Sequence, residues 1–129
     1  AELAELVTAL GVCESVEVHG TIARDEVLRA MAECRLAVSC SSFEAFGLPV
    51  GEALAIGAPV AASDIPAHRE LLHRAGVGAS FRPGDHGALA RLLRDALRGD
   101  APPRLAEPPR GWSWRERASE HVDVYLRHS

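Results

Sequence analysis

Short apolar runs alternate with stretches of helical periodicity along this chain, and no other feature constrains its fold as strongly. The runs at residues 36–38, 59–62 and 78–81 have the length and apolar content of buried strands. After the last run, apolar residues recur at helical spacing, at Leu89, Leu92, Leu93, Ala96 and Leu97. Strands that alternate with helices predict an α/β domain in which right-handed crossovers join the strands of a parallel sheet.

The first third of the chain predicts two helices and one further strand. Residues 3–10 carry one apolar helical face, and Gly11 ends that helix. Residues 16–18 read as a short strand that ends at Gly20. A second helix is predicted to carry the apolar residues at 27–32. Asp25 and Glu26 would lie in its first turn, where the helix dipole favours acidic side chains.

Proline and glycine residues predict the limits of the later elements. Pro49 opens a helix at a position where its missing N–H costs nothing, and Gly57 closes that helix. Pro66 starts another helix in the same way. Four prolines make residues 99–111 a loop, and residues 112–128 are predicted to form a terminal helix.

Size and charge exclude several classes of protein. With 129 residues and a mass of 13.8 kDa, the chain fits a single domain. Its net charge of −4 argues against a general nucleic-acid binder. All 14 basic residues are arginine, which excludes a lysine Schiff base and a phosphate-binding lysine within this chain. The sequence contains no apolar run near the roughly 20 residues that span a bilayer and no signal peptide.

The cysteine and histidine residues indicate neither a disulfide framework nor a metal centre. The three cysteines are an odd number without close pairing, which favours reduced, partly buried thiols and a cytoplasmic location. His68 and His73 are five residues apart, which does not match the spacing of a helical metal-binding pair. We therefore expect no metal site.

The loop at residues 39–48 is the first place to look for a ligand. It follows a predicted strand of a parallel sheet, and ligands bind beyond the carboxyl ends of such strands. Gly47 lets the backbone approach a ligand closely. The N–H groups of Leu48, Val50 and Gly51 are expected to point out of the helix start, where a phosphate or carboxylate binds.

Two carboxylates flank this helix start. Glu44 precedes the helix and Glu52 lies about one turn inside it. Carboxylates accept hydrogen bonds from the paired hydroxyls of sugars, so two acids around a diphosphate site fit a nucleotide sugar. The alternative is that both are ordinary acids that the helix dipole stabilises, and spacing alone does not decide between the two interpretations.

The segment SSFEAFGLPVGEALAIGAPVAAS, at residues 41–63, resembles a known motif. It is similar to the donor-site motif, Glu-x7-Glu, of retaining glycosyltransferases of the GT-B fold in glycosyltransferase family four. Residues 18–20, 63–70, 83–85 and 112–114 also have counterparts in that family. The resemblance therefore covers nearly the whole chain.

The resemblance implies a role for each matching residue. Glu52 matches the acid that holds the ribose hydroxyls of the nucleotide, and Glu44 matches the catalytic acid that faces the transferred sugar. Ser41 matches a serine near that site, although a loop hydroxyl that bonds its own backbone explains it equally well. Two further groups of residues bind the donor by resemblance: Phe46, Gly47 and Leu48 along the sugar and diphosphate, and Gly20, Thr21 and Ile22 along the base.

Three positions depart from the family pattern. Cys40 replaces a common proline, and the choice there is between a nucleophile and a small buried residue, of which we expect the second. Ala45 replaces a glycine, and its methyl group could crowd the sugar, which leaves the identity of the sugar open. Gly51 stands where the family commonly has an apolar residue.

By this resemblance, the fold is the C-terminal part of a GT-B glycosyltransferase, with a Rossmann-like parallel sheet flanked by helices, and residues 1–129 form a partial nucleotide-sugar-binding domain. The parent enzyme would transfer a hexose from a nucleotide diphosphate sugar to an acceptor hydroxyl, as hexosyltransferases of polysaccharide biosynthesis do. It needs no cofactor. Its acceptor would be held by a missing N-terminal domain, so we expect the isolated chain to be inactive and to self-associate. The parent would be cytoplasmic, at the inner face of the membrane through peripheral association.

Two other functions remain open. A sugar-nucleotide epimerase of the same architecture would use the acid pair for proton chemistry. A non-catalytic interaction module would keep the fold and bind no nucleotide sugar.

Overall fold

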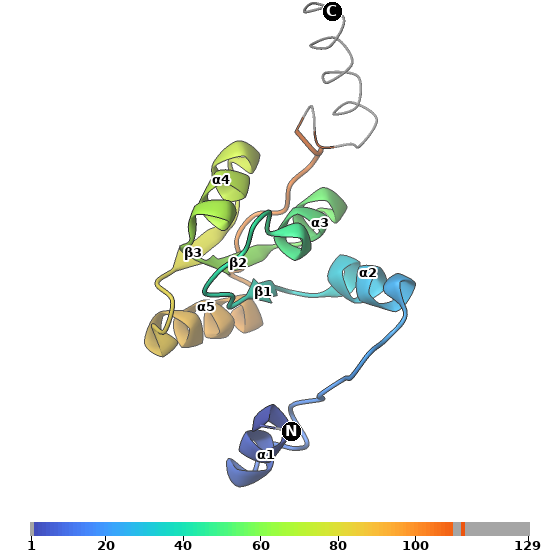
Figure 1. Cartoon of the computed structure of the whole chain (residues 1–129), viewed down its shortest axis with the longest axis vertical. Coiled ribbons are helices and arrows are strands. Elements are labelled where there is room, and N and C mark those ends of the chain that lie inside the picture. The colour runs from blue at the N-terminus through green and yellow to red at the C-terminus, as the bar shows by residue number, and fades with distance from the viewer. Residues whose placement is uncertain (1, 110–111, 113–129) are drawn as a thin grey trace, which may run out of the picture.

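The computed structural model describes residues 2–109 and Trp112, and the predicted terminal helix lies outside these residues apart from Trp112. Its centre is a three-stranded parallel sheet in the order β1-β2-β3 (Figure 1). The strands are β1 (Ala37–Ser39), β2 (Val60–Ser63) and β3 (Ala79–Phe81), which confirms the three predicted strands to within one or two residues at each end. The predicted α/β fold class is therefore correct.

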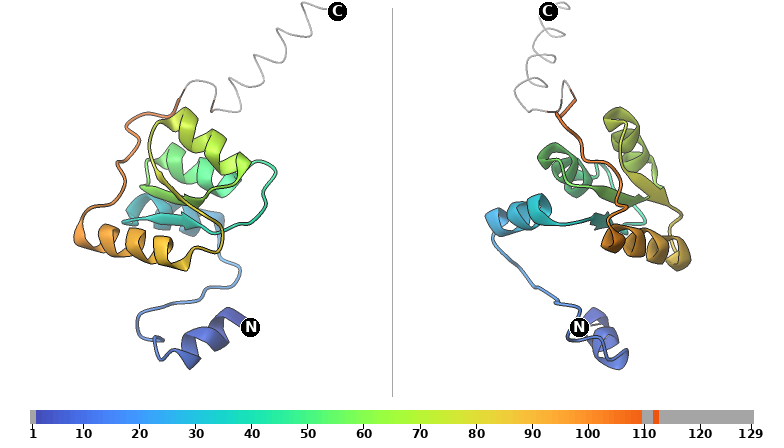
Figure 2. Two further views of the ribbon diagram at one scale, coloured as in Figure 1. Left: turned by 90° about the vertical axis from the view of Figure 1, so that its left-hand side faces the viewer. Right: turned by 180° about the vertical axis from the view of Figure 1, so that it is seen from behind.

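Helices cover both faces of this sheet. α3 (Leu48–Ile56) joins β1 to β2, and α4 (Pro66–Ala75) joins β2 to β3. α2 (Arg24–Glu33) packs against α3, and α5 (His86–Arg98) lies across the opposite face of the sheet (Figure 2). In the part of the chain that the structure describes, none of the helices has both the length and the apolar content to cross a bilayer.

The central strand β2 is buried from end to end, as expected for a parallel strand covered on both faces. Val60, Ala61 and Ala62 have at most 1% of their surface exposed. In contrast, β1 is an edge strand, and its Val38 is 39% exposed. The prediction that residues 36–38 are buried on both faces is therefore wrong, because β2 is the only strand that pairs with β1 in the described sheet.

Helix α3 contributes half of the buried core cluster, because it packs against α2, α4 and the sheet. Val50, Ala53 and Leu54 belong to the buried core around β2. Gly57 closes the helix in the left-handed conformation, with φ of 82°. Pro49 lies in the first turn, so both predicted ends of this helix are confirmed.

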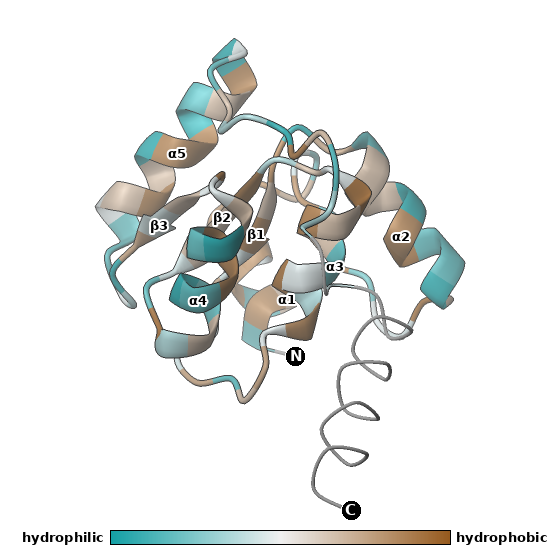
Figure 3. Ribbon diagram, turned by 90° about the horizontal axis from the view of Figure 1, so that it is seen from above, coloured by the Kyte–Doolittle hydropathy of each residue, from teal (hydrophilic) through white to brown (hydrophobic). Residues whose placement is uncertain are grey.

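The amphipathic stripe of α5 is confirmed only in part. Ala96 is buried, whereas Leu93 and Leu97 are 42% and 70% exposed. Figure 3 shows apolar and polar residues alternating along this helix. Asp85 caps its start by accepting a hydrogen bond from the backbone N–H of Ala88 at 2.8 Å.

The N-terminal region differs from the prediction. α1 (Glu2–Ala9) forms as expected, and Gly11 follows it with φ of 66°. Residues 16–18, however, form no strand and are exposed. Figures 1 and 2 both show this segment apart from the sheet. A parallel strand needs a neighbour to complete its hydrogen bonds, and none lies beside this segment in the described structure.

Residues 99–109, the described part of the predicted proline-rich loop, contain no helix or strand and contact the ends of two helices. The Arg104 guanidinium donates to the carbonyl oxygens of Gly57 and Cys34, each at 3.0 Å. These carbonyls lie at the ends of α3 and α2, where a positive charge complements the helix dipole. Leu105 and Trp112 pack against the core beside them.

Candidate functional site

The loop between β1 and α3 lies at the carboxyl ends of β1 and β2, as predicted for a ligand site. Its start is tied to the end of β2, because the Ser63 hydroxyl donates a hydrogen bond to the Ser41 carbonyl oxygen at 2.5 Å. Ser63 is fully buried, so this bond is made away from solvent. The loop is thus anchored to the sheet before it reaches Glu44.

The structure brings together Ser41 and Glu44. The Ser41 hydroxyl donates to Glu44 Oε1 at 2.8 Å, a charge-assisted hydrogen bond between half-buried side chains. The sequence left open whether this hydroxyl bonds its own backbone, and its partner is the acid instead. Ser41 therefore orients the Glu44 carboxylate.

A buried histidine, His68 on α4, connects this loop to the core. None of its surface is exposed. Its Nδ1 lies 3.0 Å from the Ser63 carbonyl oxygen and 3.2 Å from the Ser63 hydroxyl, and its Nε2 lies 3.5 Å from the Ser39 hydroxyl. Sequence reasoning considered His68 only as a metal ligand and missed this role. The sequence signal that could have revealed this role is the position of His68 one helical turn from Leu71 and Leu72, on the face of α4 that packs against the core.

Gly47 is the N-cap of α3 and adopts the left-handed conformation, with φ of 65° and ψ of 40°. A Cβ atom at this position would meet His68 Cδ2 at 3.0 Å and Leu71 Cδ1 at 3.1 Å. Glycine is therefore required here by backbone conformation and by packing against α4. This packing requirement adds to the close ligand approach predicted from the sequence.

Replacing Gly47 with alanine should destabilise the chain by about 1–3 kcal/mol, because alanine is strained at this φ and its methyl group presses on His68. Urea denaturation of the chain measures the loss. Gly84→Ala is the matched control, since Gly84 has φ of 82° but no atom within 4 Å of its Cβ position. An equal loss in both variants would contradict the packing requirement.

The start of α3 offers fewer free amides than predicted. The N–H of Gly51 donates to the Gly47 carbonyl oxygen at 3.0 Å, in the first hydrogen bond of the helix. The prediction for Gly51 is therefore wrong. Leu48 and Val50 remain, because the first N–H groups of a helix have no partner within it and Pro49 has no N–H.

Glu52 lies on the other side of α3, toward α2. Its Oε1 accepts a hydrogen bond from Arg24 Nη2 at 2.5 Å. The Glu52 side chain is 32% exposed and Arg24 is 73% exposed, so the pair lies at the surface. Sequence reasoning did not find Arg24, which lies 28 residues earlier in the chain.

The remaining predicted site residues are exposed at two separate places. Phe46 and Leu48, at the end of the loop, are 77% and 60% exposed. Gly20, Thr21 and Ile22 form an exposed segment just before α2. Among the described residues, no hydrogen bond joins this segment to the loop.

Residues 1–110 match the protein family described as Glycosyl transferases group 1. The chain belongs to this family. It is 34% identical over 123 residues to phosphatidyl-myo-inositol mannosyltransferase of Mycobacterium leprae (strain TN), covering 89% of the chain and 32% of that protein. It is also 30% identical over 130 residues to MMP alpha-(1->4)-mannosyltransferase of Mycolicibacterium hassiacum, covering 94% of the chain and 31% of that protein. The chain thus spans about a third of the length of these relatives, and no solved structure matches it.

The three cysteines make none of the contacts described above for the candidate site. Cys13, Cys34 and Cys40 are all free, and only Cys34 is partly buried. Cys40 is exposed, so its prediction as a small buried residue is wrong; it directly follows β1, which lies at the edge of the described sheet. Within residues 2–109 and Trp112, no cluster of three His, Cys, Asp or Glu residues could hold a metal ion.

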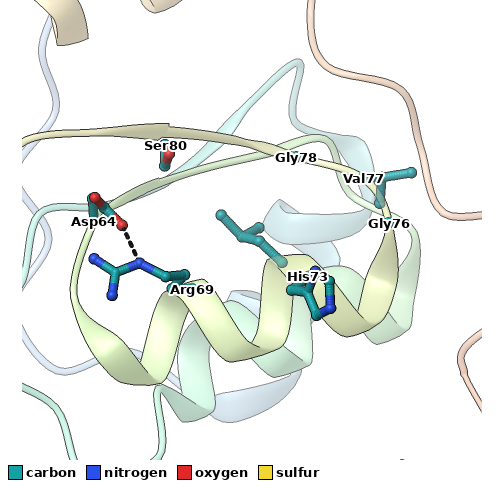
Figure 4. A pocket seen from close by; sticks show the side chains of 8 residues that line it. Asp64, Arg69, His73, Gly76, Val77, Gly78 and Ser80 are labelled. Atoms are coloured by element: carbon teal, nitrogen blue, oxygen red, sulfur yellow. Dashed lines mark hydrogen bonds and ion pairs between the residues drawn. The ribbon is translucent and has the colours of Figure 1, made fainter.

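A pocket of about 280 Å³ lies between α4 and β3 (Figure 4). Asp64 and Arg69 line one end, where Arg69 Nε donates to Asp64 Oδ1 at 2.9 Å. This hydrogen bond, more than the charges of Arg69 and Arg82, holds the pKa of Asp64 below its ordinary value, against a smaller effect of burial.

Removing the Arg69 hydrogen bond by Arg69→Gln should raise the pKa of Asp64 toward its ordinary value. Because the folded-state pKa is lowered, the pair stabilises the fold above the unfolded pKa, and this contribution is lost as pH falls through the folded value. Both side chains are exposed, so the effect on stability should be small. An NMR titration of the Asp64 carboxyl group measures the change. Arg74→Gln, on the same helix, should leave the midpoint unchanged, and an unchanged midpoint in Arg69→Gln would contradict the prediction.

Proposed function

We propose that this chain forms the nucleotide-sugar donor site of a retaining glycosyltransferase. The transferred group would be a hexose, and the acceptor would be a hydroxyl group. The observation that carries the proposal is the arrangement around the start of α3, where Ser41 orients Glu44 before the helix and Glu52 lies inside the helix. Family membership supports glycosyl transfer, and the names of both relatives, which are mannosyltransferases, support a hexose.

In this proposal the two acids have different partners. Glu52 accepts hydrogen bonds from the ribose hydroxyls through Oε2, because Arg24 already occupies Oε1. Glu44 faces the transferred sugar and is the catalytic carboxylate. Each role requires an ionised carboxylate, which accepts hydrogen bonds more strongly than a neutral group.

Backbone groups would bind the rest of the donor. The N–H groups of Leu48 and Val50, at the positive end of the α3 dipole, would hold the diphosphate and stabilise it as the leaving group. Phe46 and Gly47 would contact the sugar, and residues 20–22 would lie along the base. No resident cofactor or metal is needed for these contacts.

Turnover would require more than this chain. The chain covers about a third of each relative, and transfer requires an acceptor held in near-attack geometry against the donor. We therefore expect the isolated chain to bind the donor and form no product, with the acceptor bound by a further domain. The exposed edges of β1 and β3 and the exposed Leu97 support self-association of the isolated chain. The intact protein would work at the cytoplasmic face of the membrane.

NMR titration of the 129-residue chain with nucleoside diphosphates and nucleotide sugars tests the donor site. The amide signals of Leu48 and Val50 should shift, together with those of residues 20–22. A chain that binds none of these compounds would be an interaction module, and the proposal would fail. A product assay with the intact protein then separates transfer with retention from epimerisation of the nucleotide sugar.

A further inference from the structure

We propose that His68 is a positioning residue for Glu44, acting through Ser63 and Ser41. This inference rests on the proposed function, because it assigns the positioning of the proposed catalytic carboxylate to a buried imidazole on α4. The contacts form a continuous chain: His68 to Ser63, Ser63 to Ser41, and Ser41 to Glu44.

The direction of each hydrogen bond in this chain follows from its acceptors. The Ser63 carbonyl oxygen can only accept, so His68 Nδ1 carries a proton and donates it. The Ser41 carbonyl oxygen can also only accept, so the Ser63 hydroxyl donates to it and in turn accepts from Nδ1. In a neutral ring with its proton on Nδ1, His68 Nε2 accepts a hydrogen bond from the Ser39 hydroxyl at 3.5 Å. All four contacts agree with a neutral imidazole protonated on Nδ1.

The same imidazole contacts both ends of the loop that carries Glu44. Its nitrogen atoms reach Ser39 and, through Ser63, Ser41 at the beginning of the loop. Its Cδ2 atom lies beside Gly47 at the end, 3.0 Å from the position that a Cβ atom would take there. A loop held at both ends by one fully buried ring presents Glu44 at a fixed position.

The binding of the nucleotide should survive the loss of the ring nitrogen atoms, because a phenyl ring in the same place still packs against Gly47 at the start of α3. Glu52 lies on the α2 side of α3, in contact with Arg24, whereas His68 and Gly47 lie on the α4 side. A defect confined to the position of Glu44 should therefore lower turnover and leave nucleotide affinity unchanged. A general loss of packing would lower both.

The test compares two variants of the intact protein. His68→Phe keeps a ring of similar shape and removes both nitrogen atoms, and it should lower kcat about 10-fold to 100-fold with the nucleoside diphosphate Kd unchanged. His68→Asn puts an amide N–H near the position of Nδ1 and should recover most of kcat. His73→Phe, an exposed histidine on the same helix, is the control and should keep wild-type kcat.

Coupling to Glu44 separates positioning from packing. In a Glu44→Gln background, His68→Phe should have little further effect on kcat, because the group that it positions is already gone. A full additional loss in that background would overturn the inference while leaving the proposed function intact. If Glu44→Gln itself leaves kcat unchanged, the proposed role of Glu44 fails first.

One further measurement uses the unmodified chain and so does not depend on whether any variant folds. Long-range ¹H–¹⁵N NMR of the His68 ring should report a neutral imidazole protonated on Nδ1. A proton on Nε2 alone would remove the donor to Ser63 and overturn the inference.

Discussion

Replacing Glu44 with glutamine should lower kcat of the intact protein about 100-fold or more while leaving its affinity for the nucleoside diphosphate unchanged. Positive charge develops at the anomeric carbon as the bond to the leaving group breaks, and a carboxylate beside it stabilises that charge. Glutamine has the same shape, and its amide oxygen can still accept the hydrogen bond from Ser41. The variant therefore removes the charge without releasing the loop. Steady-state kinetics and calorimetry with the diphosphate measure the two quantities.

The matched control is Glu70→Gln, which makes the same change of charge at an exposed position on α4. It should leave both kcat and the dissociation constant at the wild-type values. Equal kcat values for Glu44→Gln and the wild type would contradict the catalytic role of Glu44. A parallel loss of diphosphate affinity would instead assign Glu44 to nucleotide binding.

The sequence predicts the elements whose signals are local. Pro49, Gly57 and Pro66 mark helix ends in the structure as they do in the sequence, because each acts through its own backbone. The run around Val60 is a strand because its residues are apolar on both faces and the sheet needs a buried centre. These signals do not depend on distant parts of the chain.

The failed predictions of a strand and of burial depend on neighbours in space. Residues 16–18 have the composition of a strand, but a strand forms only beside another strand, and the described sheet ends at β1. Val38 is exposed and Cys40 is not buried for the same reason, since β1 is an edge. Composition alone cannot report which strand lies at an edge.

The residues of the candidate site also divide into those that the sequence predicts and those that only the tertiary fold brings together. Glu44, Gly47 and Glu52 can be singled out in the sequence because they fall within one short segment that resembles a family motif. Arg24 and His68 contact these residues from α2 and α4, and no spacing rule links positions that only the tertiary fold brings together. The sequence does not reveal which residue caps α3, so it predicts a free N–H at Gly51, whereas the Gly47 carbonyl oxygen accepts the hydrogen bond of that N–H.

Replacing Glu52 with glutamine should weaken nucleoside diphosphate binding by the intact protein about 10-fold to 100-fold. The ribose hydroxyls would then meet a neutral amide, and a hydrogen bond to a charged group contributes roughly 1.5–3 kcal/mol. Folding stability should change little, because the Glu52–Arg24 pair is partly exposed and such pairs contribute about 0–1 kcal/mol. Calorimetry with the diphosphate measures the affinity, and urea denaturation measures the stability.

Arg24→Gln separates the carboxylate from its ion pair. It breaks the same contact as Glu52→Gln but keeps the Glu52 charge and frees Oε1, so diphosphate affinity should stay at the wild-type value or rise. If Glu52 were only an acid that stabilises its helix and its pair with Arg24, both variants would lose similar stability and neither would lose affinity. The assignment of Glu52 to the ribose therefore requires that the two variants diverge in binding while they agree in stability.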